Sequence, residues 1–353
     1  MSKFFSKKYK NLIPYVPGEQ PKEREYIKLN TNESPFPPSK KALNMVKKES
    51  VKVNLYSDPD SKQLTKAVAD YYGVDISQVI MTNGSDEVLN FAFMAYCDKD
   101  NPAIFADITY GFYKVFAEIN NVPYKVIPLK EDFTIDVNDY INEKGTIFIA
   151  NPNAPTGIIL PLTDIEKILK SNPNRVVVVD EAYIDFGGES AIKLVDEYSN
   201  LLVTQTFSKS RSMAGARLGF GVASKEIISD LVNIKYSTNP YNVNRMTAIC
   251  GIGAINDEKY FTKNCQTIIF NRNYLLTELK RLGFTATDSR TNFVFVKHEK
   301  IGGKDLYLKL KERGILVRHF DSQKIKDYNR ITIGSLSQMK ELVKQIKNIL
   351  ENK

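Results

Sequence analysis

Short apolar runs alternate with segments of helical periodicity through the first part of the chain. The run VVVV at 176–179 has no polar side, so the strand that it forms is buried on both faces. Strands that alternate with helices form a mostly parallel sheet between layers of helices, with ligands beyond the carboxyl ends of the strands. The predicted strands are 79–82, 103–107, 124–129, 146–150, 175–180, 201–207 and 218–223. The predicted helices are one between Ser61 and Gly73, then 85–96, 162–171 and 224–235.

The pattern changes from about residue 262. A long helix (264–282) is followed by short strands, one further helix and a last helix to the end, which predicts a smaller α+β lobe. The first residues are rich in proline and show little periodicity, which is typical of an extended arm. The predicted organisation is an arm at 1–40 that packs with the small domain, a large domain at 41–245 and the small domain at 246–353.

Composition narrows the class of protein. The chain has 353 residues, 42% of them hydrophobic, which is ample material for a core. The cysteines Cys97, Cys250 and Cys265 are scattered, so neither a disulfide framework nor a cysteine metal site is expected, and a reducing cytoplasm fits best. With only two histidines, His298 and His319, a histidine metal site or a serine–histidine triad has little to work with, and no metal is predicted.

The formal net charge of +8 is spread along the chain and is typical of a solvated surface that can attract anionic substrates. No stripe of aromatic residues and arginines accompanies it, so nucleic acid is not expected as a partner. No apolar run approaches the roughly 18 residues of a membrane helix, and the basic start MSKFFSKKYK is too weakly apolar for a signal peptide. We therefore expect neither membrane nor nucleic acid among the partners.

Polar residues follow several of the predicted strands. Asp180 ends the strand 175–180; alone it reads as a turn acid, but a carboxylate at the end of an apolar strand is costly without a cationic partner. Tyr183 should lie close to it in the turn. The sequence Gly84-Ser85-Asp86 begins a helix, where free N–H groups and the helix dipole suit a phosphate as well as a simple cap. The turn NPNAPTG at 151–157 places two asparagines at another strand end.

Lys209 follows the strand 201–207 between Ser208 and Ser210 and precedes a segment of small residues. A lysine in a desolvated pocket can become a nucleophile toward carbonyl groups, whereas most lysines are solvated surface charges. Ser208 and Arg217 could hold a phosphate nearby. A lysine, an acid, a tyrosine and a phosphate cradle are together the partners that pyridoxal phosphate requires.

The chain resembles the fold-type I aminotransferases and, within them, the histidinol-phosphate aminotransferases. The motifs LNTNESPF, YSDPDS, NGSDE, TYGFY, NPNAPTG, DEAYIDF and TFSKSRSMAGARLGF carry the resemblance in this order. It implies a large α/β domain with a central, mostly parallel sheet flanked by helices, a smaller α+β domain, and a homodimer with active sites at the subunit interface.

The resemblance also implies roles for individual residues. Lys209 would form the Schiff base with pyridoxal 5'-phosphate, Asp180 would pair with the pyridine nitrogen, Tyr183 would hydrogen-bond the phenolic oxygen and Tyr110 would stack on the ring. The implied phosphate contacts are Gly84, Ser85, Asp86, Ser208, Arg217 and, from the neighbouring subunit, Tyr56. The implied substrate contacts are Arg330, Arg318, Tyr15 and Tyr241.

One position departs from the family pattern. The family usually has asparagine directly before PTG, where it donates to the phenolic oxygen, and this chain has Ala154. Either Asn153 takes that role or Tyr183 fills it alone.

The implied reaction is the ping-pong transfer of an amino group between glutamate and imidazole-acetol phosphate, which gives 2-oxoglutarate and histidinol phosphate in histidine biosynthesis. A threonine-phosphate decarboxylase or an aromatic amino acid aminotransferase of the same fold are the alternatives. A non-enzymatic regulator would carry an added DNA-binding domain, for which the arm is too short, and a simple binding protein has no need of the lysine.

Overall fold

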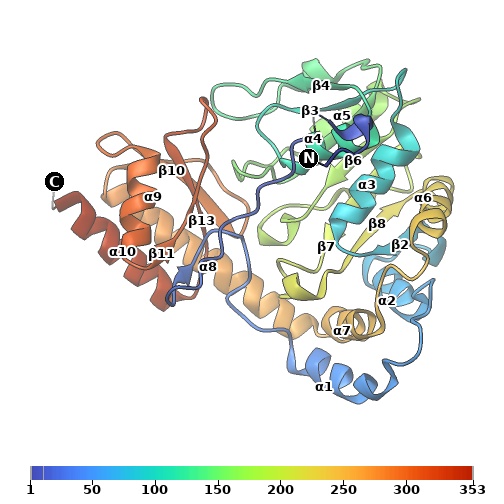
Figure 1. The fold of residues 1–353 in the computed structure, drawn as a ribbon, viewed down its shortest axis with the longest axis horizontal. Coiled ribbons are helices and arrows are strands. Elements are labelled where there is room, and N and C mark those ends of the chain that lie inside the picture. The colour runs from blue at the N-terminus through green and yellow to red at the C-terminus, as the bar shows by residue number, and fades with distance from the viewer. Residues whose placement is uncertain (1, 11, 352–353) are drawn as a thin grey trace.

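A seven-stranded sheet forms the centre of the larger part of the molecule (Figure 1). The computed structural model describes residues 2–10 and 12–351. The strand order is β2-β8-β7-β6-β5-β3-β4; β8 runs antiparallel to β2 and β7, and the other neighbours are parallel. The strands are β2 (Val79–Thr82), β3 (Ala103–Ala106), β4 (Tyr124–Ile127), β5 (Thr146–Ala150), β6 (Val177–Asp180), β7 (Leu201–Thr206) and β8 (Gly219–Ala223).

Helices cover both faces of this sheet because successive side chains of a strand point to opposite faces. Val177 and Val179 pack into one apolar cluster with α2, α5 and α7, whereas Val178 packs into another with α3, α4 and α6. A further helix, α1, lies against α7. The helices are α1 (Lys40–Glu49), α2 (Lys62–Tyr72), α3 (Ser85–Tyr96), α4 (Phe112–Asn120), α5 (Leu162–Ser171), α6 (Lys225–Thr238) and α7 (Arg245–Ile255).

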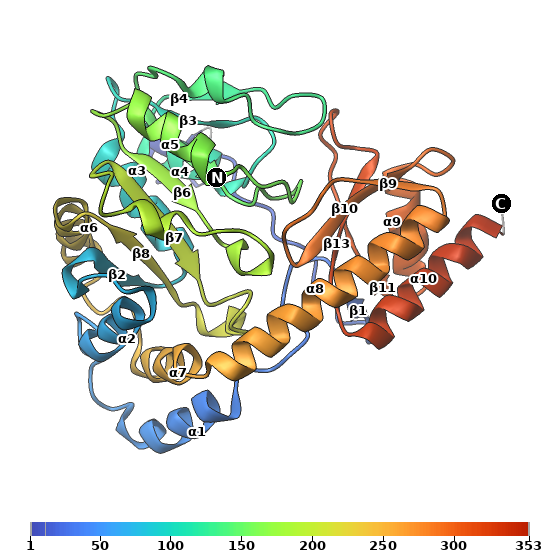
Figure 2. The same cartoon turned by 180° about the vertical axis from the view of Figure 1, so that it is seen from behind.

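A four-stranded antiparallel sheet of order β12-β13-β10-β9 forms the smaller part together with three helices. The long α8 begins beside α7 in the larger part and crosses to the smaller one (Figure 2). The elements are α8 (Glu258–Arg281), β9 (Phe284–Ala286), β10 (Phe293–His298), α9 (Gly303–Glu312), β12 (Arg318–His319), β13 (Tyr328–Thr332) and α10 (Leu336–Glu351). The predicted fold class, a large α/β unit with a smaller α+β unit, is confirmed.

The arm is tied to the smaller part by backbone pairing. β1 (Ile27–Lys28) runs parallel to β11 (Ile315–Leu316), and Leu29 accepts a backbone hydrogen bond of 2.9 Å from Thr332. The 3₁₀ helices of the chain are η1 (Lys7–Tyr9), η2 (Ser50–Lys52), η3 (Ile76–Gln78), η4 (Val137–Tyr140), η5 (Ile184–Phe186), η6 (Ala191–Leu194) and η7 (Ala214–Ala216).

Several elements differ from the predictions. The sequence pattern missed α1, α4 and α7; α7 is apolar on nearly every side, so it has no polar stripe to reveal its period. Ser61 precedes α2 but makes no capping bond; the Asp58 carboxylate accepts from the N–H of Lys62 at 2.9 Å instead. One of the short strands expected in the small lobe, β11, pairs with the arm and is not part of the four-stranded sheet.

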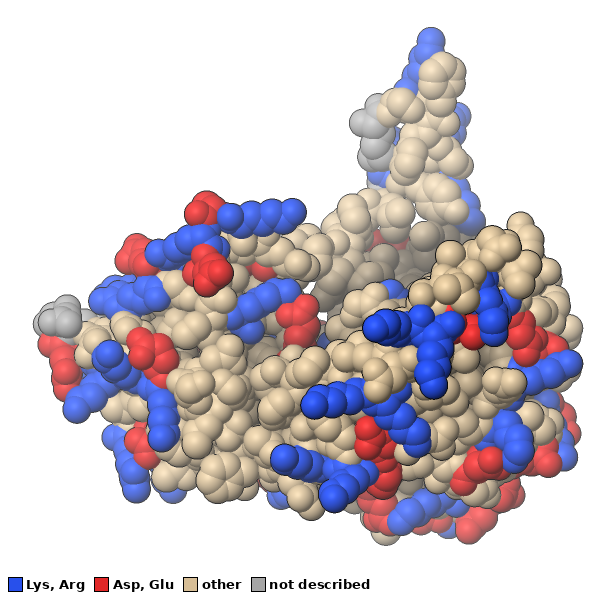
Figure 3. Space-filling model, turned by 90° about the horizontal axis from the view of Figure 1, so that it is seen from below, with Lys and Arg blue, Asp and Glu red and all other residues tan. Residues whose placement is uncertain are grey.

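Basic and acidic side chains are interspersed on the face shown in Figure 3. Among the described residues, no helix is long and apolar enough to cross a membrane. The three cysteines, Cys97, Cys250 and Cys265, are buried and free.

Candidate active site

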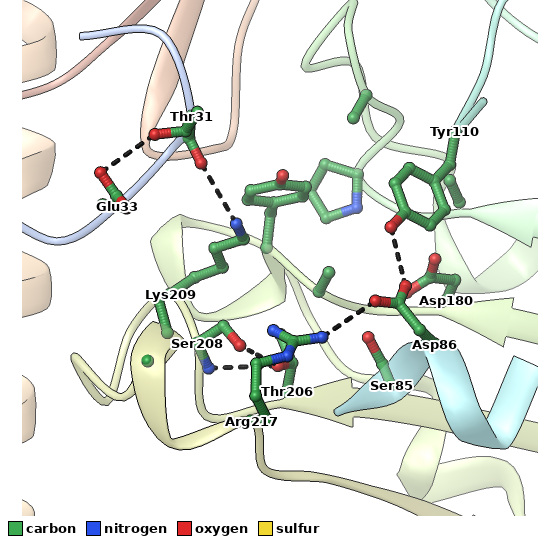
Figure 4. A pocket seen from close by; sticks show the side chains of 17 residues that line it. Thr31, Glu33, Ser85, Asp86, Tyr110, Asp180, Thr206, Ser208, Lys209 and Arg217 are labelled. Carbon is green, nitrogen blue, oxygen red and sulfur yellow. Dashed lines mark hydrogen bonds and ion pairs between the residues drawn. The ribbon is translucent and has the colours of Figure 1, made fainter. Parts of the chain in front are cut away.

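A cavity of ≈ 330 Å³ lies at the carboxyl ends of β5, β6 and β7 (Figure 4). Its position is the one expected for ligands of a parallel sheet, because the last residue of each of these strands lines it. The side chains that converge on it include Ser85, Asp86, Asp180, Ser208, Lys209 and Arg217. A second cavity of ≈ 480 Å³ adjoins it and shares Thr31, Tyr110, Ala154, Tyr183 and Lys209 with it.

Asp180 is a buried carboxylate with one free oxygen. Its Oδ2 accepts a hydrogen bond of 3.0 Å from the Tyr113 hydroxyl, and its buried Oδ1 has no partner among the described residues. Burial raises the pKa of Asp180 to about 7, and the nearby Asp86 adds to the shift. The carboxyl group can therefore accept a cationic N–H group that enters the cavity, and such a partner would stabilise its ionised form.

The start of α3 provides an anion cradle. Gly84 has the left-handed φ of 78°, and a Cβ there would come within 2.8 Å of Arg217 Nη2, so glycine keeps this approach open. The Arg217 guanidinium pairs with Asp86 at 3.0 Å, and Asp86 also accepts from the Tyr110 hydroxyl at 2.7 Å. Figure 4 shows Ser208 on the Arg217 side of the same space. Helix N–H groups, a hydroxyl and a guanidinium together suit a phosphate group.

Lys209 lies where the two cavities meet. Its Nζ donates to the backbone oxygen of Thr31 at 3.5 Å and lies 5.7 Å from the centre of the Tyr183 ring (Figure 4). An amine at this point can reach a ligand in either cavity.

Two arginines line the second cavity from neighbouring strands. Arg330 of β13 and Arg318 of β12 are directly paired in register. Arg330 donates to the backbone oxygen of Asn30 at 3.1 Å, its Nε is buried without a partner, and burial lowers its pKa. Arg318 donates to the backbone oxygen of Val16 at 3.1 Å. Neither arginine has a carboxylate partner among the described residues, so the pair is free to bind an anion that enters this cavity.

Four predicted site residues, Gly84, Asn153, Tyr56 and Tyr241, do not line either cavity. Asn153 uses its amide on Ile108 O at 2.8 Å and on Thr156 Oγ1 at 3.0 Å, so the turn presents Ala154 instead. Tyr56 and Tyr241 stack on each other with ring centres 4.6 Å apart, and Tyr56 is 80% exposed. Tyr15 does line the second cavity and stacks on Phe112 at 4.3 Å.

Sequence reasoning missed two residues of the site. Tyr113, which donates to Asp180, lies three residues after Tyr110 and so shares its face of the chain at the start of α4. Asn32, which donates to the Tyr183 hydroxyl at 2.9 Å, lies in the motif LNTNESPF, so its place in that motif is the signal that could have found it. Within the described part of the chain, no group of three or more His, Cys, Asp or Glu residues could hold a metal ion.

The sequence and the fold both match known proteins. The sequence profile of the aminotransferase class I and II family matches residues 24–346, and the chain belongs to this family. It is 49% identical over 356 residues to the histidinol-phosphate aminotransferase of Brachyspira hyodysenteriae, with both chains covered completely. The enzyme of the same name from Clostridium acetobutylicum is 46% identical over 351 residues, covering 99% of this chain and all of the relative.

A solved structure shares the fold. The histidinol-phosphate aminotransferase of Sinorhizobium meliloti, in complex with pyridoxal-5'-phosphate, superposes with a TM-score of 0.90 over 99% of both chains, at 20% identity.

Proposed function

We propose that this protein is a pyridoxal-phosphate-dependent aminotransferase that moves an amino group between glutamate and imidazole-acetol phosphate, giving 2-oxoglutarate and histidinol phosphate in histidine biosynthesis. The observation that carries the proposal is the convergence of Lys209, the free oxygen of Asp180 and the anion cradle of α3 on one cavity. The names of the relatives with 44–49% identity support the substrate assignment.

The residues present fit pyridoxal phosphate. The unpaired Oδ1 of Asp180 suits a protonated ring nitrogen, and Ser85, Ser208 and Arg217 suit the phosphate at the other end. Tyr183 lines the same space and can donate to the phenolic oxygen. When bound, this group supplies an aldehyde for amines and a ring that accepts electrons.

Lys209 is the group that moves the proton. Its Nζ would take a proton from the α-carbon of the substrate as general base and, as general acid, would deliver it to the aldehyde-derived carbon of the cofactor rather than back to the α-carbon. Arg330 and Arg318 orient the substrate through its anionic end, which is a carboxylate in glutamate and a phosphate ester in the other substrate. Because the two substrates use the same site in turn, the reaction has ping-pong order.

A homodimer in the cytoplasm completes the proposal. Tyr56 is 80% exposed in the single chain, and nearby Val51, Val53 and Leu55 are 80%, 64% and 56% exposed. Such an apolar patch favours a partner surface. We propose that a second copy covers it and that Tyr56 reaches the phosphate of the neighbouring active site. Tyr241, stacked on Tyr56, would then be a substrate contact at the same interface.

Absorbance and product analysis test the proposal. The purified protein should show the absorbance of bound pyridoxal phosphate linked to lysine, and Lys209→Ala should lose that absorbance and at least about 10⁴-fold in turnover. Lys225→Ala, an exposed lysine of α6, is the matched control and should behave as wild type. A Lys209→Ala variant with both properties intact would refute the assignment.

A substrate screen separates the alternatives. We expect glutamate-dependent formation of histidinol phosphate. Release of carbon dioxide from threonine phosphate, or faster turnover of phenylalanine or tyrosine, would instead identify one of the two other enzymes of this fold.

A further inference from the structure

The segment 30–32 touches three groups of the site in consecutive residues. The backbone oxygen of Asn30 accepts from Arg330 at 3.1 Å, and that of Thr31 accepts from Lys209 at 3.5 Å. The side-chain amide of Asn32 donates to the Tyr183 hydroxyl at 2.9 Å. This segment of the arm therefore lies against β13, the strand that carries Arg330, and lines the second cavity.

Asn32 is held in place on every side. It is 1% exposed, has a left-handed φ of 57°, and its backbone oxygen accepts from Asn292 at 3.0 Å. Its N–H donates to Thr332 Oγ1 at 3.0 Å, and its Oδ1 accepts from the same hydroxyl at 3.1 Å. Because Thr332 donates to Oδ1, the other end of the amide, Nδ2, is directed at Tyr183.

An amide donor fixes the direction of the Tyr183 hydroxyl. The side-chain amide of Asn32 donates to a lone pair of the Tyr183 hydroxyl oxygen. The hydroxyl proton of Tyr183 is therefore left to donate to another acceptor. Tyr183 lines both cavities, and Ala154, which also lines both, has no side-chain donor. The hydroxyl of Tyr183 then carries the donation to a ligand at this point.

We infer that Asn32 is a positioning residue that holds Tyr183 as a hydrogen-bond donor to the phenolic oxygen of the cofactor, and that Thr332 orients Asn32 for this purpose. The inference rests on the proposed function. Ala154 cannot donate a hydrogen bond to the phenolic oxygen of the cofactor, and the inference gives that donation to Tyr183. Tyr183 is held by Asn32 of the arm, which in turn is held by Thr332 of β13, the strand that also carries Arg330.

The test is the pH titration of the absorbance of the bound cofactor in the holoenzyme. Without the Tyr183 hydroxyl as donor, the phenolic oxygen of the cofactor is more basic. Tyr183→Phe should therefore raise the midpoint of the absorbance titration by about one pH unit, which corresponds to the free energy of one hydrogen bond. Asn32→Asp has the same shape but accepts the Tyr183 proton, so it should raise the midpoint similarly. Asn32→Gly keeps the left-handed backbone and carries no charge, and it should raise the midpoint as well.

A double-mutant cycle with the uncharged Asn32→Gly tests whether Asn32 acts through Tyr183, without the charge that Asn32→Asp introduces. Asn32→Gly combined with Tyr183→Phe should shift the midpoint no further than Tyr183→Phe alone. Thr332→Val should shift it in the same direction, whereas Thr332→Ser, which keeps the hydroxyl, should match wild type. Gel filtration and thermal unfolding of each variant establish which ones are folded, and the Thr332 pair decides the matter if the Asn32 variants do not fold.

Two outcomes have distinct meanings. Wild-type midpoints in Asn32→Gly and Thr332→Val, or shifts that add fully to that of Tyr183→Phe, would overturn the role of Asn32 while leaving the proposed function intact. A wild-type protein without any cofactor absorbance would overturn the proposed function itself.

Discussion

A buried carboxylate and a half-buried guanidinium line the two adjoining cavities, Asp180 the first and Arg330 the second. Asp180 at the end of β6 is 5% exposed, and its Oδ1 has no described partner. Arg330 of β13 also has a buried atom, Nε, without a described partner. Burial raises the pKa of Asp180 to about 7 and lowers that of Arg330, so each group is disfavoured in its charged form. Such groups are typical of sites that a ligand of opposite charge completes.

The two sides differ in how they are built. Asp180 stands on the central sheet and is held by Tyr113 of the same part of the molecule. Arg330 stands on the smaller sheet and is held by the backbone oxygen of Asn30 in the arm. Following the proposed function, we call the Asp180 side the cofactor end and the Arg330 side the substrate end. We expect the cofactor end to be rigid, whereas the geometry of the substrate end depends on how three segments distant in sequence pack together.

The largest expected effect at either end follows from Asp180→Asn. The amide keeps the shape but cannot hold a ring nitrogen in its protonated form, so turnover should fall by about 10²–10³-fold. Glu181→Gln is the matched control, since burial raises the pKa of Glu181 to about 7 as well, but its carboxylate binds Ser190, Ala191 and Gln205 away from both cavities. Steady-state kinetics should show turnover within a few-fold of wild type for the control. Equal losses in both variants would argue that Asp180 acts only through the fold.

The next effect concerns the substrate end. Arg330→Lys keeps a positive charge but loses the planar fork, so KM for both glutamate and the phosphorylated substrate should rise by about tenfold. Initial rates at varied substrate concentrations measure it. Arg318→Lys, on the neighbouring strand, provides the comparison and should have the smaller effect. Unchanged KM values for both substrates in Arg330→Lys would contradict its role.

The pH dependence of stability tests the cofactor end without catalysis. The pKa of Asp180 is raised from 3.8 to about 7 in the folded protein, so the folded state binds more protons than the unfolded state between these values. The stability of the cofactor-free protein should therefore fall as pH rises from about 4 to 7, by on the order of 3 kcal/mol from this group. Urea unfolding should show a smaller fall in Asp180→Asn. Cofactor binding should remove the contribution of Asp180 and leave that of Glu181; the same pH slope with and without cofactor would contradict this account.

The smallest effect concerns the contact between the two parts beside the substrate end. Lys324 pairs with Asp107, the residue after β3, at 2.5 Å, and the lysine side chain is 57% exposed. A pair this exposed contributes little, so Lys324→Gln should raise KM by about two- to threefold at low salt and less at high salt. Lys326→Gln, exposed in the same loop, serves as the control. A larger effect that persists in high salt would indicate that the loop itself holds the substrate.

Much of the cofactor end was predictable from sequence. Apolar strands of a parallel sheet end at one edge, so a polar residue directly after such a strand is brought to that edge whatever the loops do. Asp180, Lys209, Ser208 and Ser85 all follow this rule. Asn153 does not, because its amide is satisfied by Ile108 and Thr109 of the loop after β3 and by Thr156, and the neighbouring Ala154 lines the cavities instead.

The sequence by itself determined most of the strands of the central sheet, the polar residues at their carboxyl ends and several of the periodic helices that cover them. Only the tertiary structure decided that the arm pairs with β11 and that Asn32 contacts Tyr183, 151 residues away. It also decided that Arg330 lies at the second cavity without a carboxylate partner among the described residues. The physical reason is the sequence separation over which each feature is decided. Side-chain alternation and helix periodicity are local properties of the chain, whereas a contact between distant segments depends on how complete, packed layers fit against each other.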